Sequence, residues 1–308
     1  MPRADIPLAW VESPLQMIGA AEWAAAHGAR VDLAGRLVAQ VEETAAELTA
    51  RGALFGAQAG YYGIPWRMLR SHDHWLVGDG FSGQFRLAAA LLRPRRITFL
   101  DDGLNAVAFA DALTGERAFA RPGVAERGLA ARIAPFALDA VRLRAAAGAV
   151  DLFTAFPLGD RRASRLRDLG ATTTRHAFEW LRGTRGSLAG PREDERVILG
   201  SARVADGLVA RSDYVAWVRR EARGKPACYL PHRREPEEVL GDVARLAGVR
   251  VVRTGLPVEL TLAGTPRPLD IATLRSSAAV TLRLVLDGTG SEVREASLEG
   301  ASGRELAR

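Results

Sequence analysis

The sequence predicts an α/β protein made of two βα domains, and three observations support this prediction. Short apolar runs of strand length alternate with longer segments whose apolar residues recur at helical spacing. A polar, break-prone stretch over residues 183–195 interrupts the alternation, which then starts again. With 308 residues and 48% hydrophobic content, the chain can bury two cores of ordinary size. We expect a first domain over 1–185, a second over 195–295, and a frayed or disordered tail over 296–308.

The first domain is expected to begin with a strand at residues 6–11. Ser13 can then cap a helix that Pro14 begins and that ends near His27. The elements expected next are a strand at 31–34, a helix with apolar positions Leu37, Val41, Ala45 and Leu48 that stops at Gly52, strands at 75–78 and 97–100, and helices at 81–92 and 128–150.

The second domain repeats the same order. We expect strands at 197–200, 227–230 and 249–252, and helices at 214–222 and 236–247. Repeated βα alternation implies mainly parallel sheets with helices on both faces. Ligands of such proteins bind at the carboxyl ends of the strands, so polar residues directly after a strand are the first candidates for function.

One expected strand ends in an acidic pair. Ile97–Leu100 is followed directly by Asp101, Asp102 and Gly103. Asp and Gly also favour ordinary turns. Because neighbouring side chains on an extended segment point to opposite sides, one carboxylate should face a ligand while the other accepts backbone N–H bonds. We prefer Asp101 as a general base, with Asp102 second.

Two further polar groups follow strands of the second domain. Residues 227–230 lead into Pro231, His232 and Arg233, and the hydroxyls of Ser276 and Ser277 are adjacent farther along the chain. A carboxylate can take a proton from an attacking hydroxyl, while a histidine and serines can hold a departing phosphate. Together the three groups suit displacement of a phosphate-bearing leaving group.

This order of motifs resembles the bacterial sialyltransferases, and among them the polysialyltransferase-like group. That family has an acidic-acidic-Gly triplet, a His-containing motif often read as His-Pro, and a Ser-Ser or Ser-Thr pair. The segment Trp10–Gln16, with Ser-Pro-Leu-Gln at residues 13–16, is similar to the opening of these enzymes. The chain differs at Arg233, where the family commonly has proline.

The resemblance implies the GT-B architecture, in which two Rossmann-like domains face a central cleft. It also implies an inverting transfer of sialic acid, or a related ulosonic acid, from a CMP-activated donor to a glycan hydroxyl, without a cofactor or a metal. The residues that it suggests are Asp101, Asp102 and His232 for catalysis, with His232, Arg233, Ser276, Ser277 and Glu259 at the nucleotide and Ser13, Gln16 and Gly103 at the substrate. Two alternatives stay open, namely another nucleotide-sugar donor and a non-catalytic glycan-binding homologue.

Other features exclude function classes. Cys228 is the only cysteine, which excludes an internal disulfide and a thiol-ligated zinc cluster. The sequence contains no Gly-rich phosphate loop, no dinucleotide fingerprint and no nucleic-acid-binding motif. His72-Asp73-His74 has no third ligand at metal spacing and is interpreted as a loop.

The location is predicted from the same sequence. Without a signal pattern or a long apolar run, we expect a cytoplasmic protein. The net charge of +6 comes almost entirely from arginine. A basic helix at 128–150 would allow peripheral contact with an anionic membrane, but we prefer ordinary packing or contact with a partner as its explanation. The sequence does not predict the oligomeric state.

Overall fold

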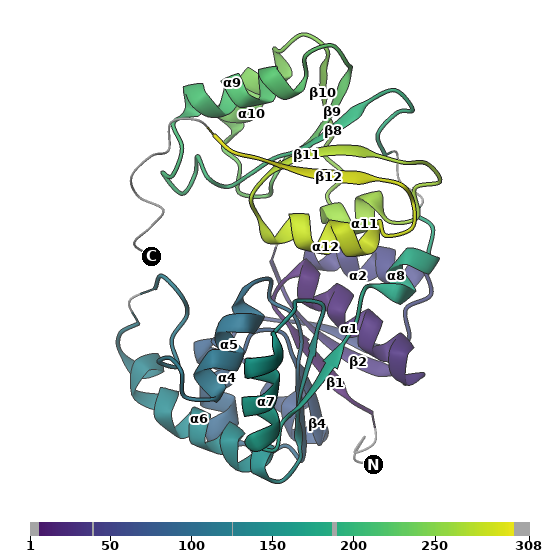
Figure 1. Ribbon diagram of the computed structural model, residues 1–308. Helices are drawn as coiled ribbons and strands as arrows, with labels where there is room; N and C mark the ends of the chain where they lie inside the picture. The colour runs from purple at the N-terminus through teal and green to yellow at the C-terminus, as the bar shows by residue number, and fades with distance from the viewer. Residues whose placement is uncertain (1–5, 39, 125, 187–189, 299–308) are drawn as a thin grey trace. The chain divides into compact units, whose positions relative to one another are not determined.

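The computed structural model describes residues 6–38, 40–124, 126–186 and 190–298. The chain divides into two compact units, Met1–Leu181 and Arg182–Arg308. Each unit is an α/β domain with its own sheet, shown in Figure 1. The boundary falls just before the polar stretch at 183–195.

The first unit has one sheet of seven parallel strands in the order β3-β2-β1-β4-β5-β6-β7. Its strands are β1 (Leu8–Val11), β2 (Val31–Arg36), β3 (Phe55–Tyr61), β4 (His74–Val77), β5 (Arg96–Phe99), β6 (Val150–Thr154) and β7 (Thr172–Arg175). The order reverses between β1 and β4, which is the switch point at which open α/β sheets form a ligand crevice.

Helices cover both faces of this sheet. They are α1 (Pro14–His27), α2 (Val41–Ala50), α3 (Trp66–Ser71), α4 (Gly83–Leu91), α5 (Asn105–Leu113), α6 (Leu129–Ala146), α7 (Asp160–Asp168) and α8 (Glu179–Gly183). Figure 1 shows α4, α5 and α6 on the opposite side of the sheet from α1 and α2. As predicted, Ser13 is the N-cap of α1 and Pro14 begins it, while Gly28 ends it with φ 56°.

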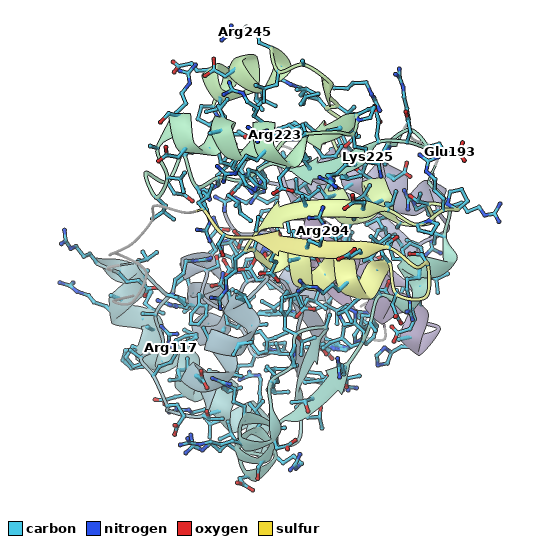
Figure 2. All side chains as sticks on the ribbon, turned by 45° about the horizontal axis from the view of Figure 1, so that its top comes forward. Arg117, Glu193, Arg223, Lys225, Arg245 and Arg294 are labelled. Atoms are coloured by element: carbon cyan, nitrogen blue, oxygen red, sulfur yellow. The ribbon has the colours of Figure 1, made fainter. Side chains whose placement is uncertain are left out.

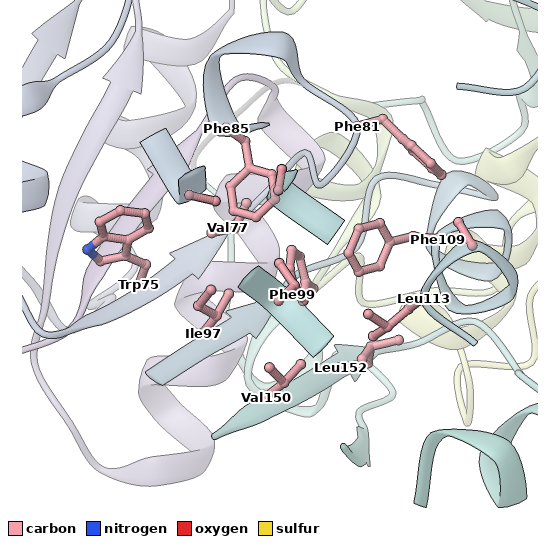
Figure 3. Close-up of a cluster of buried hydrophobic side chains, with 14 of the residues drawn as sticks. Trp75, Val77, Phe81, Phe85, Ile97, Phe99, Phe109, Leu113, Val150 and Leu152 are labelled. Carbon is pink, nitrogen blue, oxygen red and sulfur yellow. The ribbon is translucent and has the colours of Figure 1, made fainter. Parts of the chain in front are cut away.

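The core under α4 and α5 is strongly aromatic, as Figure 3 shows. Phe99, the last residue of β5, lies 4.2 Å from Phe109 between ring centroids, and Phe81 contacts Phe109 edge to face at 5.6 Å. Each such ring stabilises the fold by about 1.5–3 kcal/mol through burial. This packing holds the carboxyl end of β5 in place, where the acidic pair begins.

The second unit has five parallel strands in the order β10-β9-β8-β11-β12. They are β8 (Arg196–Leu199), β9 (Ala227–Leu230), β10 (Val249–Val251), β11 (Asp270–Leu274) and β12 (Glu292–Ala296). Its helices are α9 (Arg211–Glu221), α10 (Glu237–Ala244), α11 (Val258–Leu262) and α12 (Ser277–Val285). One buried cluster joins the sheet to α9 and α10 and another joins it to α11 and α12, so both faces are covered. The predicted α/β class with Rossmann-like units is confirmed.

Several element predictions need correction. The predicted helix at 128–150 ends at Ala146, and Val150 already begins β6. Strands β3, β7, β11 and β12 were not predicted. Three of them, β3, β7 and β12, lie at sheet edges, and the sequence FGAQAGY of β3 is poor in strand-forming residues. The interior strand β11 has no such explanation. The tail predicted from residue 296 starts too early, since Ala296 ends β12 and Leu298 packs against the α9–α10 core. Residues 299–308 lie outside the described residues.

Cys228 is fully buried in the core of β9, and burial raises its thiol pKa to about 11. It is therefore a packing residue, as expected. His72 and His74 both have internal partners, namely the Asp32 carboxylate and the Thr98 hydroxyl. Neither belongs to a group of potential metal ligands in the described part of the chain.

The basic charge is spread over the surface. Figure 2 shows Arg117, Arg223 and Arg245, which lie in the turns and bends that follow α5, α9 and α10, and Arg294 on β12. Arg294 pairs with Asp270 at 2.8 Å, one of many arginine–carboxylate contacts in the second unit. Such exposed pairs contribute little stability each. Among the described helices, none combines the length and the apolar content needed to cross a bilayer.

Candidate functional site

The carboxyl ends of β4 and β5 bring three carboxylates to the switch point of the first sheet. Asp79 follows β4, and Asp101 and Asp102 follow β5. Val77 and Phe99 are register partners at the ends of these paired strands. The two acidic turns are therefore neighbours in space, next to the segment after β1.

Asp101 is a buried structural anchor. Its side chain is 1% exposed and accepts bonds from the Thr154 hydroxyl, the Ala155 N–H at 2.7 Å and the His176 ring at 3.0 Å. These bonds tie the end of β5 to the end of β6 and to the segment after β7. Because Asp101 is buried and both of its oxygens accept bonds from the protein, the sequence-based preference for Asp101 as the base is not supported.

Asp102 has the geometry of a reactive carboxylate. Its Oδ1 accepts a bond from Gln16 Nε2 at 2.8 Å, and its Oδ2 accepts one from Asn105 Nδ2 at 3.0 Å. Arg121 Nη1 lies 3.6 Å from Oδ2. The carboxylate side chain keeps 22% of its surface exposed. Asp102 is thus fixed in direction and still accessible, and it becomes the candidate base in place of Asp101.

Gln16 positions Asp102 and does not line a pocket. It is 2% exposed, and its Oε1 accepts the Glu12 N–H at 2.6 Å while its amide nitrogen holds Asp102. Gln16 also fills the space over Gly78, where an added Cβ would lie 2.1 Å from Oε1. The predicted substrate contact of Gln16 is corrected to this positioning role.

Ser13 and Gly103 have structural roles beside the acidic pair. The Ser13 hydroxyl caps α1 through a long bond of 3.5 Å to the Gln16 N–H. Gly103 has a φ of 61°, a left-handed conformation that glycine adopts without strain and that turns the chain into α5. Their predicted contact with substrate has no support in this geometry beyond closeness to Asp102.

Asp79 and Arg121 complete the electrostatics of this edge. Asp79 pairs with Arg121 and accepts the Phe81 N–H at 2.9 Å. Burial, and then the charge of Asp102, raise the pKa of Asp79 to about 6, although Arg121 opposes the shift. Arg121 therefore lies between two carboxylates and holds both near the same point.

Two cavities adjoin this edge. One of about 20 Å³ is lined by Asp79, Asp102, Asn105 and the ring of Phe109, and has room for about one water. A larger one of about 520 Å³ is lined mainly by apolar groups of β2, β3 and α2, with Arg36 and Tyr62 among them. Its size is within the range of small-molecule sites. Arg36 pairs with Glu12 at 2.7 Å, and the backbone N–H of Glu12 donates to Gln16, which in turn donates to Asp102. A chain of polar contacts therefore links this pocket to Asp102.

In the second unit, His232 follows β9 and is held in one tautomer. Its Nδ1 accepts the Arg234 N–H at 3.2 Å, so in the neutral ring the proton is on Nε2. Burial and the charges of Arg234 and Arg233 lower the pKa of His232 below its ordinary value. At neutral pH His232 is therefore an uncharged ring with an Nε2–H donor.

A buried network supports the backbone at His232. Glu235 accepts the His232 N–H at 3.1 Å and the Tyr229 hydroxyl, which bonds Tyr214 at 2.8 Å. Burial raises the pKa of Glu235. Gly200, directly after β8, fits closely against this network, because an added Cβ would lie 2.3 Å from a Glu235 oxygen.

Ser276 and Ser277 begin α12 beside the switch point of the second sheet, where β8 and β11 pair. Ser276 is the N-cap residue, but its hydroxyl makes no capping bond. It is exposed, and the first N–H groups of a helix attract anions. Arg203 Nη2 donates to the Arg275 carbonyl at 3.2 Å and adds positive charge at this point. In the sheet β8 alone separates β9 from β11, so the segments that carry His232 and Ser276 leave strands that are about 10 Å apart.

Two predicted nucleotide contacts are placed differently. Glu259 is 6% exposed within α11 and accepts the Thr281 hydroxyl at 2.5 Å, and burial raises its pKa. It therefore joins α11 to α12, and the predicted nucleotide contact is not supported. Arg233 is exposed beside His232, which agrees with the predicted position without testing its role.

Sequence reasoning missed Arg121, Asn105 and Arg203. Arg121 and Arg203 lie outside regular strands and helices, so no periodicity points to them. Asn105 lies three residues after Asp102 at the start of α5, a spacing that could have been recognised.

The chain matches no family model and no curated protein. Among solved structures, it is similar to UGT2 of Phytolacca americana, complexed with UDP-2-fluoro-glucose and pterostilbene, at 14% identity and a TM-score of 0.47, covering 95% of this chain and 80% of that one. Spinosyn rhamnosyltransferase SpnG has 15% identity and a TM-score of 0.35, with 91% and 78% covered. Spinosyn forosaminyltransferase SpnP has 12% identity and a TM-score of 0.41, with 96% and 81% covered. Likeness at this level carries no argument about activity, and none of these names is that of a sialyltransferase.

Proposed function

We propose that this chain is a GT-B-like glycosyltransferase that moves a sugar from a nucleotide-activated donor to a hydroxyl, with inversion at the anomeric carbon. One observation carries the proposal. A fixed and accessible carboxylate, Asp102, follows β5 beside the switch point of the first sheet, where Gln16 and Asn105 each donate a hydrogen bond to it.

The first unit supplies the base. Gln16 and Asn105 each donate a hydrogen bond to Asp102, one to either oxygen, and so orient the carboxylate toward an incoming hydroxyl. Positioned acid–base groups of this kind contribute about 10²–10⁴-fold to a rate. The acceptor would enter through the apolar cavity of about 520 Å³ beside β2 and β3.

The second unit supplies groups for the leaving phosphate. His232 presents an uncharged Nε2–H, and Ser276 presents a hydroxyl that makes no capping bond at the start of α12. Backbone N–H groups and hydroxyls stabilise a developing phosphate charge without a metal.

The reaction is a single displacement. Asp102 takes the proton of the acceptor hydroxyl as its oxygen attacks the anomeric carbon. The bond from that carbon to the phosphate oxygen breaks, and its electron pair leaves with the nucleotide. His232 donates a hydrogen bond to the departing phosphate, and the proton stays on Asp102 until solvent removes it.

The donor that we propose first is CMP-linked sialic acid or a related ulosonic acid, because the motif order resembles the sialyltransferases. A different nucleotide sugar, such as a UDP-sugar, fits the same phosphate groups and is the second candidate. A catalytically inactive glycan-binding homologue is the third, and it would bind a ligand without turnover.

The first experiment is calorimetric titration of the full chain with CMP and, separately, with UDP. Under the first candidate CMP binds and UDP does not. His232→Ala should weaken CMP binding by about 10–100-fold, which corresponds to the loss of one hydrogen bond to a charged group. Arg245→Ala, at an exposed position after α10, is the matched control and should bind like wild type. Absence of binding to folded wild-type protein would contradict the nucleotide-sugar proposal.

A further inference from the structure

A second cluster of titratable groups lies where the first unit ends. It joins Glu22 of α1, His176 after β7 and Glu179 at the start of α8. A ring nitrogen of His176 and one carboxylate oxygen from each glutamate all lie within 4.8 Å of one another. The catalytic chemistry proposed above uses none of these three residues.

The histidine has one nitrogen occupied and one unpartnered. Nε2 bonds Asp101 at 3.0 Å, while Nδ1 is buried with no hydrogen-bond partner in the described residues. The ring is 4% exposed and stacks on Phe153 at 4.5 Å with planes 10° apart, so it cannot turn away. Because Asp101 occupies Nε2, Nδ1 is the nitrogen that is left for a further ligand.

This arrangement is the one that metal-binding histidines adopt. A ligating histidine normally donates its other ring N–H to a carboxylate, which fixes the tautomer and makes the ligating nitrogen more basic. Asp101 provides that carboxylate. The neutral tautomer with its proton on Nε2 leaves a lone pair on Nδ1 that a metal ion can accept.

The negative charge of the cluster also favours binding of a cation. Glu22, Glu179 and Asp101 are three carboxylates around one imidazole, and Glu22 is only 2% exposed. Burial raises the pKa of Glu22, against the lowering effects of its backbone donors and of His176. A proton on His176 would offset one negative charge, whereas a divalent cation offsets two and also uses the Nδ1 lone pair.

We propose that Glu22, His176 and Glu179 form a binding site for a divalent transition-metal cation, with Zn²⁺ as the preferred ion. One imidazole and two carboxylates are a donor set that suits zinc, whose ligand bonds of about 2.0–2.2 Å require only small side-chain movements here. Glu179 lies at the surface, so its side chain can make the larger adjustment.

The role of this site is structural. Glu22 already accepts the N–H groups of Trp180 at 3.1 Å and Leu181 at 2.8 Å, which fastens the first turn of α8 to α1. A cation shared with Glu179 would strengthen that attachment at the point where the chain leaves the first unit. Because two of the three ligands are buried, a substrate has little access to the metal.

The test is metal binding by the full chain after treatment with a chelator. Titration with Zn²⁺ should give a stoichiometry near one, and saturating Zn²⁺ should raise Tm on the order of 5 °C. Mg²⁺ at the same concentration should have little effect, because an imidazole nitrogen is a poor ligand for it. These readouts need no substrate, so they are independent of the glycosyltransferase proposal.

The decisive variant is Glu179→Gln, because its exposed position keeps the apo protein folded. It should lose the Tm rise and most of the affinity, whereas Glu43→Gln, an exposed control on α2, should behave like wild type. Wild-type protein that binds no Zn²⁺, or Glu179→Gln protein that binds it as wild type does, would overturn the assignment.

Discussion

The two neighbouring aspartates should respond to the same substitution in opposite ways. Asp101→Asn should mainly lower stability, while Asp102→Asn should mainly lower turnover. The difference follows from exposure, since Asp101 is 1% exposed with three donors directed at it and Asp102 keeps an accessible surface.

The magnitude for Asp101 can be estimated from its bonds. A hydrogen bond to a charged group is worth about 1 kcal/mol more than one between neutral groups. Removing the charge of Asp101 weakens three such bonds, which costs about 3 kcal/mol. For a unit of this size that corresponds to a fall in Tm of roughly 6–12 °C. Asp102→Asn keeps its shape and its partial exposure, so its Tm should change by less than about 2 °C.

The assay is release of CMP from a CMP-activated donor, read beside thermal unfolding of the same preparations. Asp102→Asn should lower kcat by about 10²–10⁴-fold with donor affinity retained. Asp101→Asn, measured well below its Tm, should keep turnover within about tenfold. If instead Asp101→Asn kept the wild-type Tm and lost turnover while Asp102→Asn stayed active, the assignment of the base would be wrong.

Three other outcomes are expected. Gly200→Ala should abolish nucleotide binding, because the Cβ of the alanine would displace the Glu235 carboxylate. Titration with CMP measures the binding, and a thermal melt of the same protein shows whether it is folded. Because the pKa of Asp79 is about 6 in the folded state and lower when unfolded, its protonation stabilises the fold at low pH, and this contribution is lost as the pH rises from about 4 to 6. A Tm-versus-pH series should show that decline in wild type and not in Asp79→Asn. If α6 meets an anionic membrane, the double variant Phe136→Ser and Leu143→Ser, at side chains 69% and 72% exposed, should sediment less with anionic vesicles, and equal sedimentation would count against that contact.

The electrostatics at the carboxyl edge of the first sheet make Arg121 a sensitive position. It pairs with Asp79 and lies 3.6 Å from Asp102, so it balances two carboxylates that would otherwise repel each other. Burial and these two charges act on Arg121 in opposite directions, and its pKa is raised overall. A guanidinium in this place offsets the two negative charges that Asp79 and Asp102 bring to the edge of the sheet.

The strand ends that carry function could be found from the sequence because their signals are local. Three apolar residues and a threonine followed by two aspartates predict the end of β5, and ACYL followed by Pro-His predicts the end of β9. The edge strand β3 could not be found, since glycine, alanine and glutamine give it no strand pattern and its position depends on pairing with β2.

The sequence by itself determined which residue types follow the strands: the aspartate pair, a histidine and two serines. Only the tertiary structure decided what each can do. Asp101 and Asp102 are chemically identical, and they differ because residues far along the chain, Thr154 and His176, surround one of them while Gln16 holds the other from α1. Burial and hydrogen-bond partners come from contacts between distant segments, and these set the charge and direction of a carboxylate.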